Sequence, residues 1–169
     1  RGGEVETLLQ GVHAIAAPGL PGTVCAQGAG AQVVIDAPVG NGTAAQRQGV
    51  VEIARLGKGR AVLFGHDGYF DPASLQKADT TPLLLHLIQW AAPQNARPRV
   101  GGIDHPQLAD ELKKNGVNAV AIDRAAWRTA IPECNIVFFP LSVPRDDAEI
   151  AVVRRYLDGG GAAFLAGTG

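Results

Sequence analysis

Ile136-Val137-Phe138-Phe139 is an uninterrupted apolar run in the second half of the chain. A run of this kind is typical of a central strand that is covered on both faces of a sheet. Three further apolar segments, at residues 99–103, 119–123 and 162–166, flank it and alternate with stretches of helical spacing. Strands and helices that alternate through short loops indicate a parallel sheet with right-handed crossovers. This half therefore predicts a doubly wound α/β fold with flavodoxin-like strand order.

Three helices are expected between these strands, at residues 106–115, 125–130 and 146–158. Gly116 follows the first of them, and Gly159-Gly160-Gly161 follows the last. Glycine is common just past the end of a helix because it adopts a left-handed conformation without strain.

The first half has a different pattern, with strand candidates at residues 23–27, 32–36, 50–55 and 60–65. A tight turn at residues 56–59 predicts a hairpin, so we expect an antiparallel β-meander that extends the sheet. Amphipathic spacing predicts a short helix within residues 5–13 and an apolar, buried helix over residues 81–92, capped by Thr80 or Thr81. The Pro-rich stretch at 93–98 divides the chain into two parts, 1–97 and 98–169, which we expect to share one sheet.

Composition narrows the classes of function. The chain has 169 residues, 46% of them hydrophobic, which indicates a packed core. Its 15 basic and 16 acidic residues give a net charge of −1, which does not favour nucleic acid as a partner. No apolar run approaches the roughly 20 residues that span a bilayer, so membrane insertion is not expected. Two cysteines, Cys25 and Cys134, are interpreted as buried thiols, with a single bridge as the alternative.

The loop after the strand at 60–65 carries His66, Asp67 and Tyr69 within four residues. Ligands and catalytic groups gather beyond the carboxyl ends of strands in open α/β sheets, so these residues are the first candidate site. A histidine beside a carboxylate can act as a general base, which makes His66 and Asp67 weak catalytic candidates. The alternative is structural, with His66 bonded to backbone and Tyr69 packed on the sheet.

Asp104 and His105 are the second candidate pair for ligand binding, because they follow a strand and precede a helix. Asp104 is also a plausible helix cap, with Pro106 in the first turn. Asp123-Arg124 and Ser142 follow other strands, but no Gly-rich loop or Gly-x-Ser-x-Gly elbow accompanies them, and Ser142 is interpreted as a helix cap. The four histidines lack metal-ligand spacing, so neither a metal nor a cofactor is expected.

Several stretches resemble, in order, the N-terminal region of the TRP-channel-associated factors and of bacterial proteins with a similar arrangement. The similar stretches are Leu8-Leu9-Gln10-Gly11-Val12, residues 54–60 running into Gly65-His66-Asp67-Gly68-Tyr69-Phe70, residues 83–91, and Leu157-Asp158-Gly159-Gly160-Gly161. In that family a class I glutamine amidotransferase-like domain precedes an enhancin-type metallopeptidase-like domain.

The resemblance implies an amidotransferase-like fold that has lost its enzyme activity. The nucleophilic Cys of a working amidotransferase would follow the strand at 162–166, where this chain has Gly167-Thr168-Gly169, and no His-Glu-x-x-His is present. We therefore expect a non-catalytic recognition or scaffolding module beside a metallopeptidase-like domain, with a protein or glycan partner at the strand-end loops. A small hydrolase with a site around His66 is the alternative. By resemblance, a bacterial protein of this kind would be extracytoplasmic.

Overall fold

The computed structural model describes residues 2–19, 22–39, 46–140 and 142–167. In chain order the elements are α1 (Gly2–Leu8), β1 (Ala31–Val39), β2 (Gln46–Leu56), β3 (Gly59–Phe64), η2 (Asp67–Phe70), α2 (Pro72–Leu75), α3 (Thr80–Ala91), β4 (Arg99–Ile103), α4 (Pro106–Lys114), β5 (Asn118–Ile122), α5 (Trp127–Ala130), η3 (Ile131–Glu133), β6 (Ile136–Phe139), α6 (Asp147–Asp158) and β7 (Ala162–Ala166). The two η elements are short 3-10 helices.

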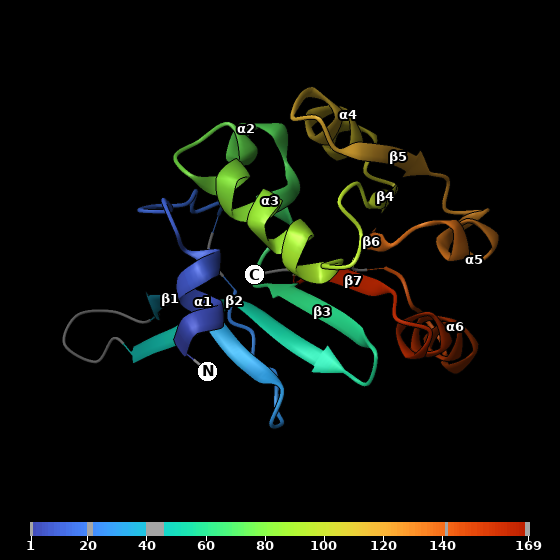
Figure 1. The fold of residues 1–169 in the computed structure, drawn as a ribbon, viewed down its shortest axis with the longest axis horizontal. Helices are drawn as coiled ribbons and strands as arrows, with labels where there is room; N and C mark the ends of the chain where they lie inside the picture. The colour runs from blue at the N-terminus through green and yellow to red at the C-terminus, as the bar shows by residue number, and fades with distance from the viewer. Residues whose placement is uncertain (1, 20–21, 40–45, 141, 168–169) are drawn as a thin grey trace.

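Within these residues seven strands form one sheet, in the order β1-β2-β3-β7-β6-β4-β5 (Figure 1). β1, β2 and β3 pair antiparallel, whereas β3, β7, β6, β4 and β5 run parallel to one another. The predicted α/β class and the antiparallel meander are therefore confirmed. The hairpin between β2 and β3 is confirmed too, and Gly57 in its turn has a φ of 61°, which glycine adopts without strain.

Helices cover both faces of the parallel strands. One hydrophobic core contains side chains of α1, α3 and α4, among them Leu8, Leu87 and Leu108. A second core contains side chains of α5 and α6, among them Trp127 and Val153. This arrangement explains the continuous apolar character of β6, because a strand between two helical layers is shielded from water on both faces.

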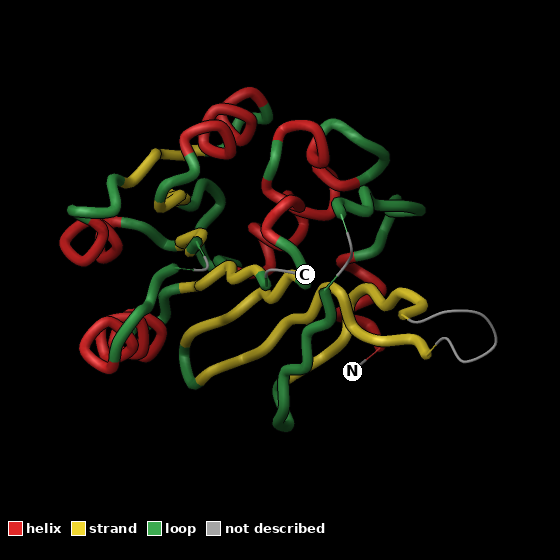
Figure 2. The backbone as a smooth tube through the Cα atoms, turned by 180° about the vertical axis from the view of Figure 1, so that it is seen from behind, coloured by secondary structure: helices red, strands yellow, loops and turns green. Residues whose placement is uncertain are grey.

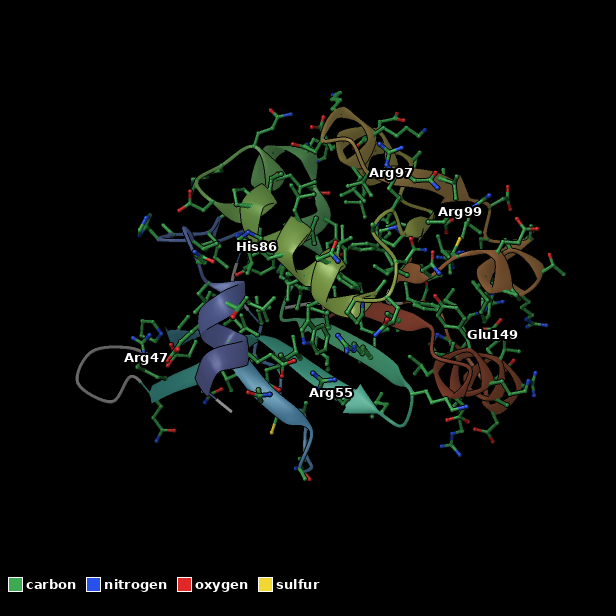
Figure 3. The ribbon with its side chains drawn as sticks, viewed as in Figure 1. Arg47, Arg55, His86, Arg97, Arg99 and Glu149 are labelled. Atoms are coloured by element: carbon green, nitrogen blue, oxygen red, sulfur yellow. The ribbon has the colours of Figure 1, made fainter. Side chains whose placement is uncertain are left out.

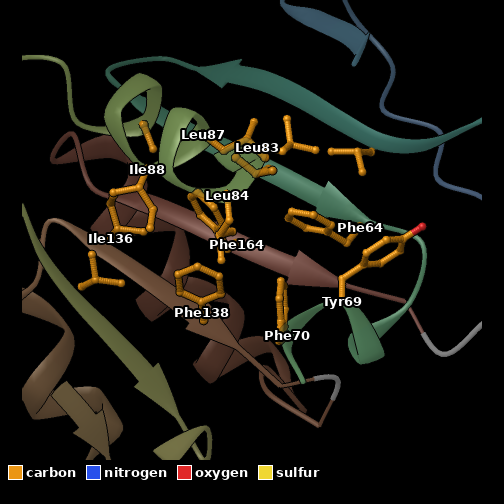
Figure 4. Packing of buried hydrophobic residues seen from close by; sticks show 14 of the residues in the cluster. Phe64, Tyr69, Phe70, Leu83, Leu84, Leu87, Ile88, Ile136, Phe138 and Phe164 are labelled. Carbon is orange, nitrogen blue, oxygen red and sulfur yellow. The ribbon is translucent and has the colours of Figure 1, made fainter. Parts of the chain in front are cut away.

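The centre of the larger core is a row of side chains that crosses three strands. Val62 of β3 lies opposite Phe164 of β7, which lies opposite Phe138 of β6. Phe138 and Phe164 are fully buried, and their ring centroids are 4.5 Å apart. Leucines of α3, including Leu87, pack against this row (Figure 4). The apolar run Ile136–Phe139 thus forms the central strand that its sequence predicts.

The prediction of a strand at residues 23–27 is wrong. These residues form a loop that crosses the back of the sheet before β1 begins (Figure 2). The amide of Val24 donates to the carbonyl of Gly49 at 2.9 Å, and the amide of Ala26 donates to the Glu52 carboxylate at 2.5 Å. β3 pairs with β2 only as far as Val51, and Val24 bonds to β2 just beyond that point. The next amide, that of Ala26, bonds a side chain instead of a β2 carbonyl, so this segment does not continue as a strand beside β2.

Two helix starts also differ from the sequence prediction. The first helix lies at Gly2–Leu8, earlier than the predicted 5–13, and Gly11 follows it with a φ of 73°. The second begins after Asp79, so neither Thr80 nor Thr81 caps it. Instead, the Asp79 carboxylate accepts the amides of residues 13 and 14, and the Thr80 hydroxyl accepts that of residue 16. The side chains of Asp79 and Thr80 therefore bind the backbone of residues 13–16, which is distant in sequence. Rules for helix capping consider only neighbouring residues and do not predict such contacts.

Candidate functional site

The loops that follow the parallel strands meet at one edge of the sheet, which we call the carboxyl edge. This edge carries His66 and Asp67 after β3, Asp104 and His105 after β4, Asp123 and Arg124 after β5, Ser142 after β6, and Gly167 after β7. Both predicted candidate groups therefore lie on the same edge. It is the edge where ligands bind in open α/β sheets.

The sheet changes winding direction between β4 and β6. β4 has β5 on one side and β6 on the other, and all three run parallel. α4, which follows β4, packs on one face, whereas α6, which follows β6, packs on the opposite face. Loops that leave neighbouring strands in opposite directions leave a crevice between them, the usual ligand position in this class of fold.

Arg124 joins the loops on both sides of this crevice. Its Nε lies 2.5 Å from Asp104 Oδ2, and its Nη2 donates to the hydroxyl of Ser142. Asp104 has a φ of 56°, a left-handed conformation that is uncommon outside glycine and that aspartate tolerates better than most residues. One guanidinium group therefore connects the loops after β4, β5 and β6, and side chains of both charges remain partly exposed beside it.

Two capping predictions at this edge are wrong. The residue that precedes α4 is His105, and its side chain makes no cap. Asp104 does not cap α4 either, and its carboxylate pairs with Arg124. Asp146 caps α6 by accepting the amide of Glu149 at 2.8 Å, so Ser142 is not its cap. The side chains of Asp104 and Ser142 bind Arg124, which is distant in sequence, instead of capping the helices that follow them.

His105 lies half-buried between this crevice and the loop after β3. Its ring meets the ring of Phe70 edge to face, with centroids 5.7 Å apart. Its Nε2 is buried and has no hydrogen-bond partner among the described residues. Burial lowers the pKa of His105, and the nearby carboxylates of Asp104, Asp67 and Asp71 oppose that shift. A cavity of about 310 Å³ lies here, lined by Phe70, Asp71 and residues 104–108.

We expect His105 to be neutral at pH 7 and to titrate below the ordinary histidine value of 6.5. The measurement is an NMR titration of the ring protons of His105. Because the folded pKa is lowered, the unfolded chain binds the proton more readily, so His105 destabilises the fold as the pH falls below about 6.5. Titration of His105 at or above the ordinary histidine value of 6.5 would contradict this assignment.

His66 is held by backbone on one side. Its Nδ1 accepts the amide of Gly68 at 2.8 Å and also lies 3.1 Å from Asp67 Oδ1. A nitrogen that accepts an amide proton carries no proton of its own, so it cannot donate to Asp67 at the same time. Tyr69 is 3% exposed and packs on Phe64, with ring centroids 5.6 Å apart, and burial raises its pKa. The structural alternative for this loop therefore fits the contacts of His66 and Tyr69.

The end of β7 lies directly beside this loop. The amide of Asp67 donates to the carbonyl of Gly167 at 3.1 Å, and the amide of Gly167 donates to the carbonyl of Phe64 at 2.7 Å. The predicted elbow position, Gly167-Thr168-Gly169, thus begins next to His66 and Asp67. Thr168 and Gly169 lie outside the described residues.

Neither cysteine lies in the site. Cys25 is exposed, which corrects the prediction of a buried thiol, and Cys134 is buried just before β6, at the opposite edge of the sheet. Both are free thiols, and burial raises the pKa of Cys134. In the part of the chain that the structure describes, no group of His, Cys, Asp and Glu is arranged to hold a metal ion. No helix among those residues is long and apolar enough to cross a membrane.

The sequence alone gives Arg124 and Ser142 little weight, although the structure joins them to each other and to Asp104 at the carboxyl edge. The available signal was their position directly after strands. That signal becomes specific only when the strand order places β5, β4 and β6 side by side.

Comparisons with known proteins show the fold. No family model matches the chain, and no curated protein matches its sequence. The chain is similar to a segment of the IMPa metallopeptidase from Pseudomonas aeruginosa in solved structures, one of them in complex with an O-glycopeptide (TM-score 0.72) and one with T-antigen (TM-score 0.71). Identity is 16% in both, and 98% and 97% of this chain are covered. The chain spans 19% of the length of that metallopeptidase, whose fold it shares over this segment.

Proposed function

We propose that this chain is a recognition or scaffolding module of a larger peptidase-type protein, and that it binds its ligand at the crevice around Arg124. The fold shared with a segment of a metallopeptidase supports a position beside a peptidase domain. The order β5-β4-β6-β7 corresponds to the flavodoxin-like order 2-1-3-4, which supports the finer fold assignment. We keep the division into 1–97 and 98–169, and an extracytoplasmic location for a bacterial source, as parts of this proposal.

The observation that carries the proposal is the link between Arg124, Asp104 and Ser142 beside His105. This link supplies a guanidinium, a carboxylate and a hydroxyl, and the neighbouring cavity is lined by His105 and Phe70, whose rings meet edge to face. Such a set of donors and acceptors with one aromatic face suits a hydroxyl-rich ligand. Since related structures hold an O-glycopeptide and T-antigen, we propose the glycan of a glycopeptide as the ligand class.

A binding role without amidotransferase chemistry is supported by the positions of the thiols. Cys134 lies before β6, at the opposite edge of the sheet from the crevice, and burial raises its pKa, which disfavours the nucleophilic thiolate. Cys25 lies in the loop before β1. The predicted elbow position, residues 167–169, reads Gly-Thr-Gly.

Calorimetric titration with an O-glycopeptide, and with the same peptide lacking its glycan, tests the proposal. We expect saturable binding of the glycosylated form and a loss of about tenfold in affinity for Arg124→Gln, equivalent to about 1.4 kcal/mol. Arg97→Gln is the matched control, because Arg97 is exposed before β4, at the other edge of the sheet (Figure 3). Equal affinity for both peptides, or equal losses in the two variants, would refute a glycan site at Arg124.

The hydrolase alternative rests on the position of His66 and Asp67 beside the start of the elbow position. It predicts turnover of an O-glycopeptide or ester substrate that disappears in His66→Ala. Product formation by the wild type, with loss in that variant, would replace the recognition proposal. Binding without any product supports it.

A further inference from the structure

The amino edge of the sheet, where the parallel strands begin, carries two adjoining cavities. The larger, of about 710 Å³, lies among η3, α6 and the glycine run before β7, and the smaller, of about 450 Å³, lies at the end of α3 and the start of β3. Asn135 and Gly160 line both, so the cavities meet at the starts of β6 and β7. We call these two cavities together the amino-edge trough.

Every charged residue that lines the trough is a cation: Arg128 and Arg155 in the larger cavity, and Lys58 and Arg60 in the smaller. Two of them are already in contact with other groups. Arg128 binds Glu149, but Glu149 also binds Arg145, so this group of three keeps a net positive charge.

Arg60 and the two exposed cations complete the charge pattern. The Arg60 guanidinium lies 4.9 Å from the centre of the Trp90 ring, and burial together with Arg55 lowers its pKa. It also donates to the carbonyl of Trp90, and the Glu4 carboxylate opposes the fall in its pKa. Arg60 is thus already bound within the fold, and the exposed cations of the trough are the ones that can meet an anion. Lys58 and Arg155 are exposed at the rim.

Helix dipoles explain only part of this pattern. Arg155 lies in the last turn of α6, where a cation complements the negative end of the helix. Arg60 of β3 donates to the carbonyl of Trp90 in the last turn of α3, so a helix end accounts for it as well. Lys58 lies in the turn between β2 and β3, outside both helices. Cations from separate elements therefore converge on one trough.

The remaining lining indicates what kind of anion fits. Ile131, Pro132, Val152 and the ring of Tyr156 give the larger cavity an apolar wall. The amides of Gly159, Gly160 and Gly161 are all bonded to carbonyls of α6, so no backbone nest is open for a compact phosphate. Cations that lie apart from one another beside an apolar wall suit a ligand with several separate carboxylates and apolar side chains between them.

We propose that the amino-edge trough binds an acidic peptide segment of a partner protein, whose carboxylates meet Lys58 and Arg155 and whose apolar side chain enters the larger cavity. The site is separate from the crevice around Arg124, which lies at the opposite edge of the sheet. It would give the module a second contact, with protein instead of glycan.

Fluorescence anisotropy with a labelled peptide of alternating Glu and Leu tests this proposal, and the same peptide with Gln for Glu is the ligand control. At low salt we expect the Glu peptide to bind at least about tenfold more tightly than the Gln peptide, and added salt to weaken it. Arg155→Glu should weaken binding about tenfold, whereas Arg154→Glu should change it by about twofold or less. Arg154 is the matched control because it is the exposed neighbour on α6 that does not line either cavity.

Three outcomes would overturn the proposal. Equal losses in the two arginine variants would mean that the net charge, and not the trough, attracts the peptide. Equal binding of the Glu and Gln peptides would exclude recognition of carboxylates. Displacement of the Glu peptide by inorganic phosphate at the same charge concentration would indicate a site for compact anions. Thermal melts of both variants establish that each is folded at the temperature of the measurement.

Discussion

Phe164→Ala is expected to destabilise the fold by about 3–5 kcal/mol, the usual cost of removing a fully buried aromatic ring. Phe164 is 0% exposed and lies on β7 between β3 and β6. Its ring contacts Phe138 at 4.5 Å and Phe64 at 6.4 Å between centroids. Strands on both sides and the leucines of α3 are fixed by the same core, so the cavity cannot collapse easily.

Urea unfolding followed by circular dichroism measures this loss. Val33→Ala is the control, because Val33 is 47% exposed on β1 and its truncation should cost less than about 0.5 kcal/mol. A cost below about 1 kcal/mol for Phe164→Ala would contradict a core centred on these rings.

Glu149→Gln is the second change with a large expected effect. Glu149 is fully buried at the start of α6 (Figure 3). Its carboxylate accepts from Arg128 Nη2 at 2.8 Å and from the Arg145 amide at 2.8 Å. Glutamine has the same shape, but its NH2 group would face one of these donors, and two guanidinium groups would lose their anion. We expect a clear fall in Tm, in contrast to Glu133→Gln, which alters only an exposed pair with Arg99.

Glu149 also makes the free energy of unfolding depend on pH in the acidic range. Hydrogen bonds from Arg128 and from the Arg145 amide lower the pKa of Glu149 to about 2, from an ordinary value of 4.5, although its desolvation opposes the shift. A lowered folded pKa means that the stabilising charge is fully present above pH 4.5 and is lost as the pH falls toward 2.

Chemical denaturation at several pH values separates this contribution from that of other carboxylates. We expect the difference in the free energy of unfolding between wild type and Glu149→Gln to be constant above about pH 5 and to shrink below it. The wild type should take up about one more proton on unfolding in that window than the variant. A difference that stays constant down to pH 2 would show that the ionised carboxylate is not what stabilises the start of α6.

Local sequence patterns determined most of the secondary structure. Short stretches of sequence were enough to predict the strand at residues 136–139, the alternating strands and helices from residue 99 onward, and the turn at Gly57. Apolar periodicity and glycine conformation act over a few residues, so these elements were predicted correctly. The same patterns failed at residues 23–27, where the amide of Ala26 bonds the Glu52 side chain instead of a strand carbonyl.

The candidate site was predictable only in part. Placing His66, Asp67, Asp104 and His105 after parallel strands was enough to predict that they share one edge of the sheet. The partners of these side chains were not predictable, because Arg124 reaches Asp104 and Ser142 across 20 and 18 residues of sequence.

What the sequence by itself determined is therefore the α/β class, the antiparallel extension and the edge on which polar side chains gather. Only the tertiary structure decided which of those side chains meet, that Tyr69 belongs to the core, and that cations from separate elements line one trough at the opposite edge. The physical reason is that local patterns record burial and backbone conformation within a segment. Contacts between distant charges depend on strand order, which the whole packed sheet sets.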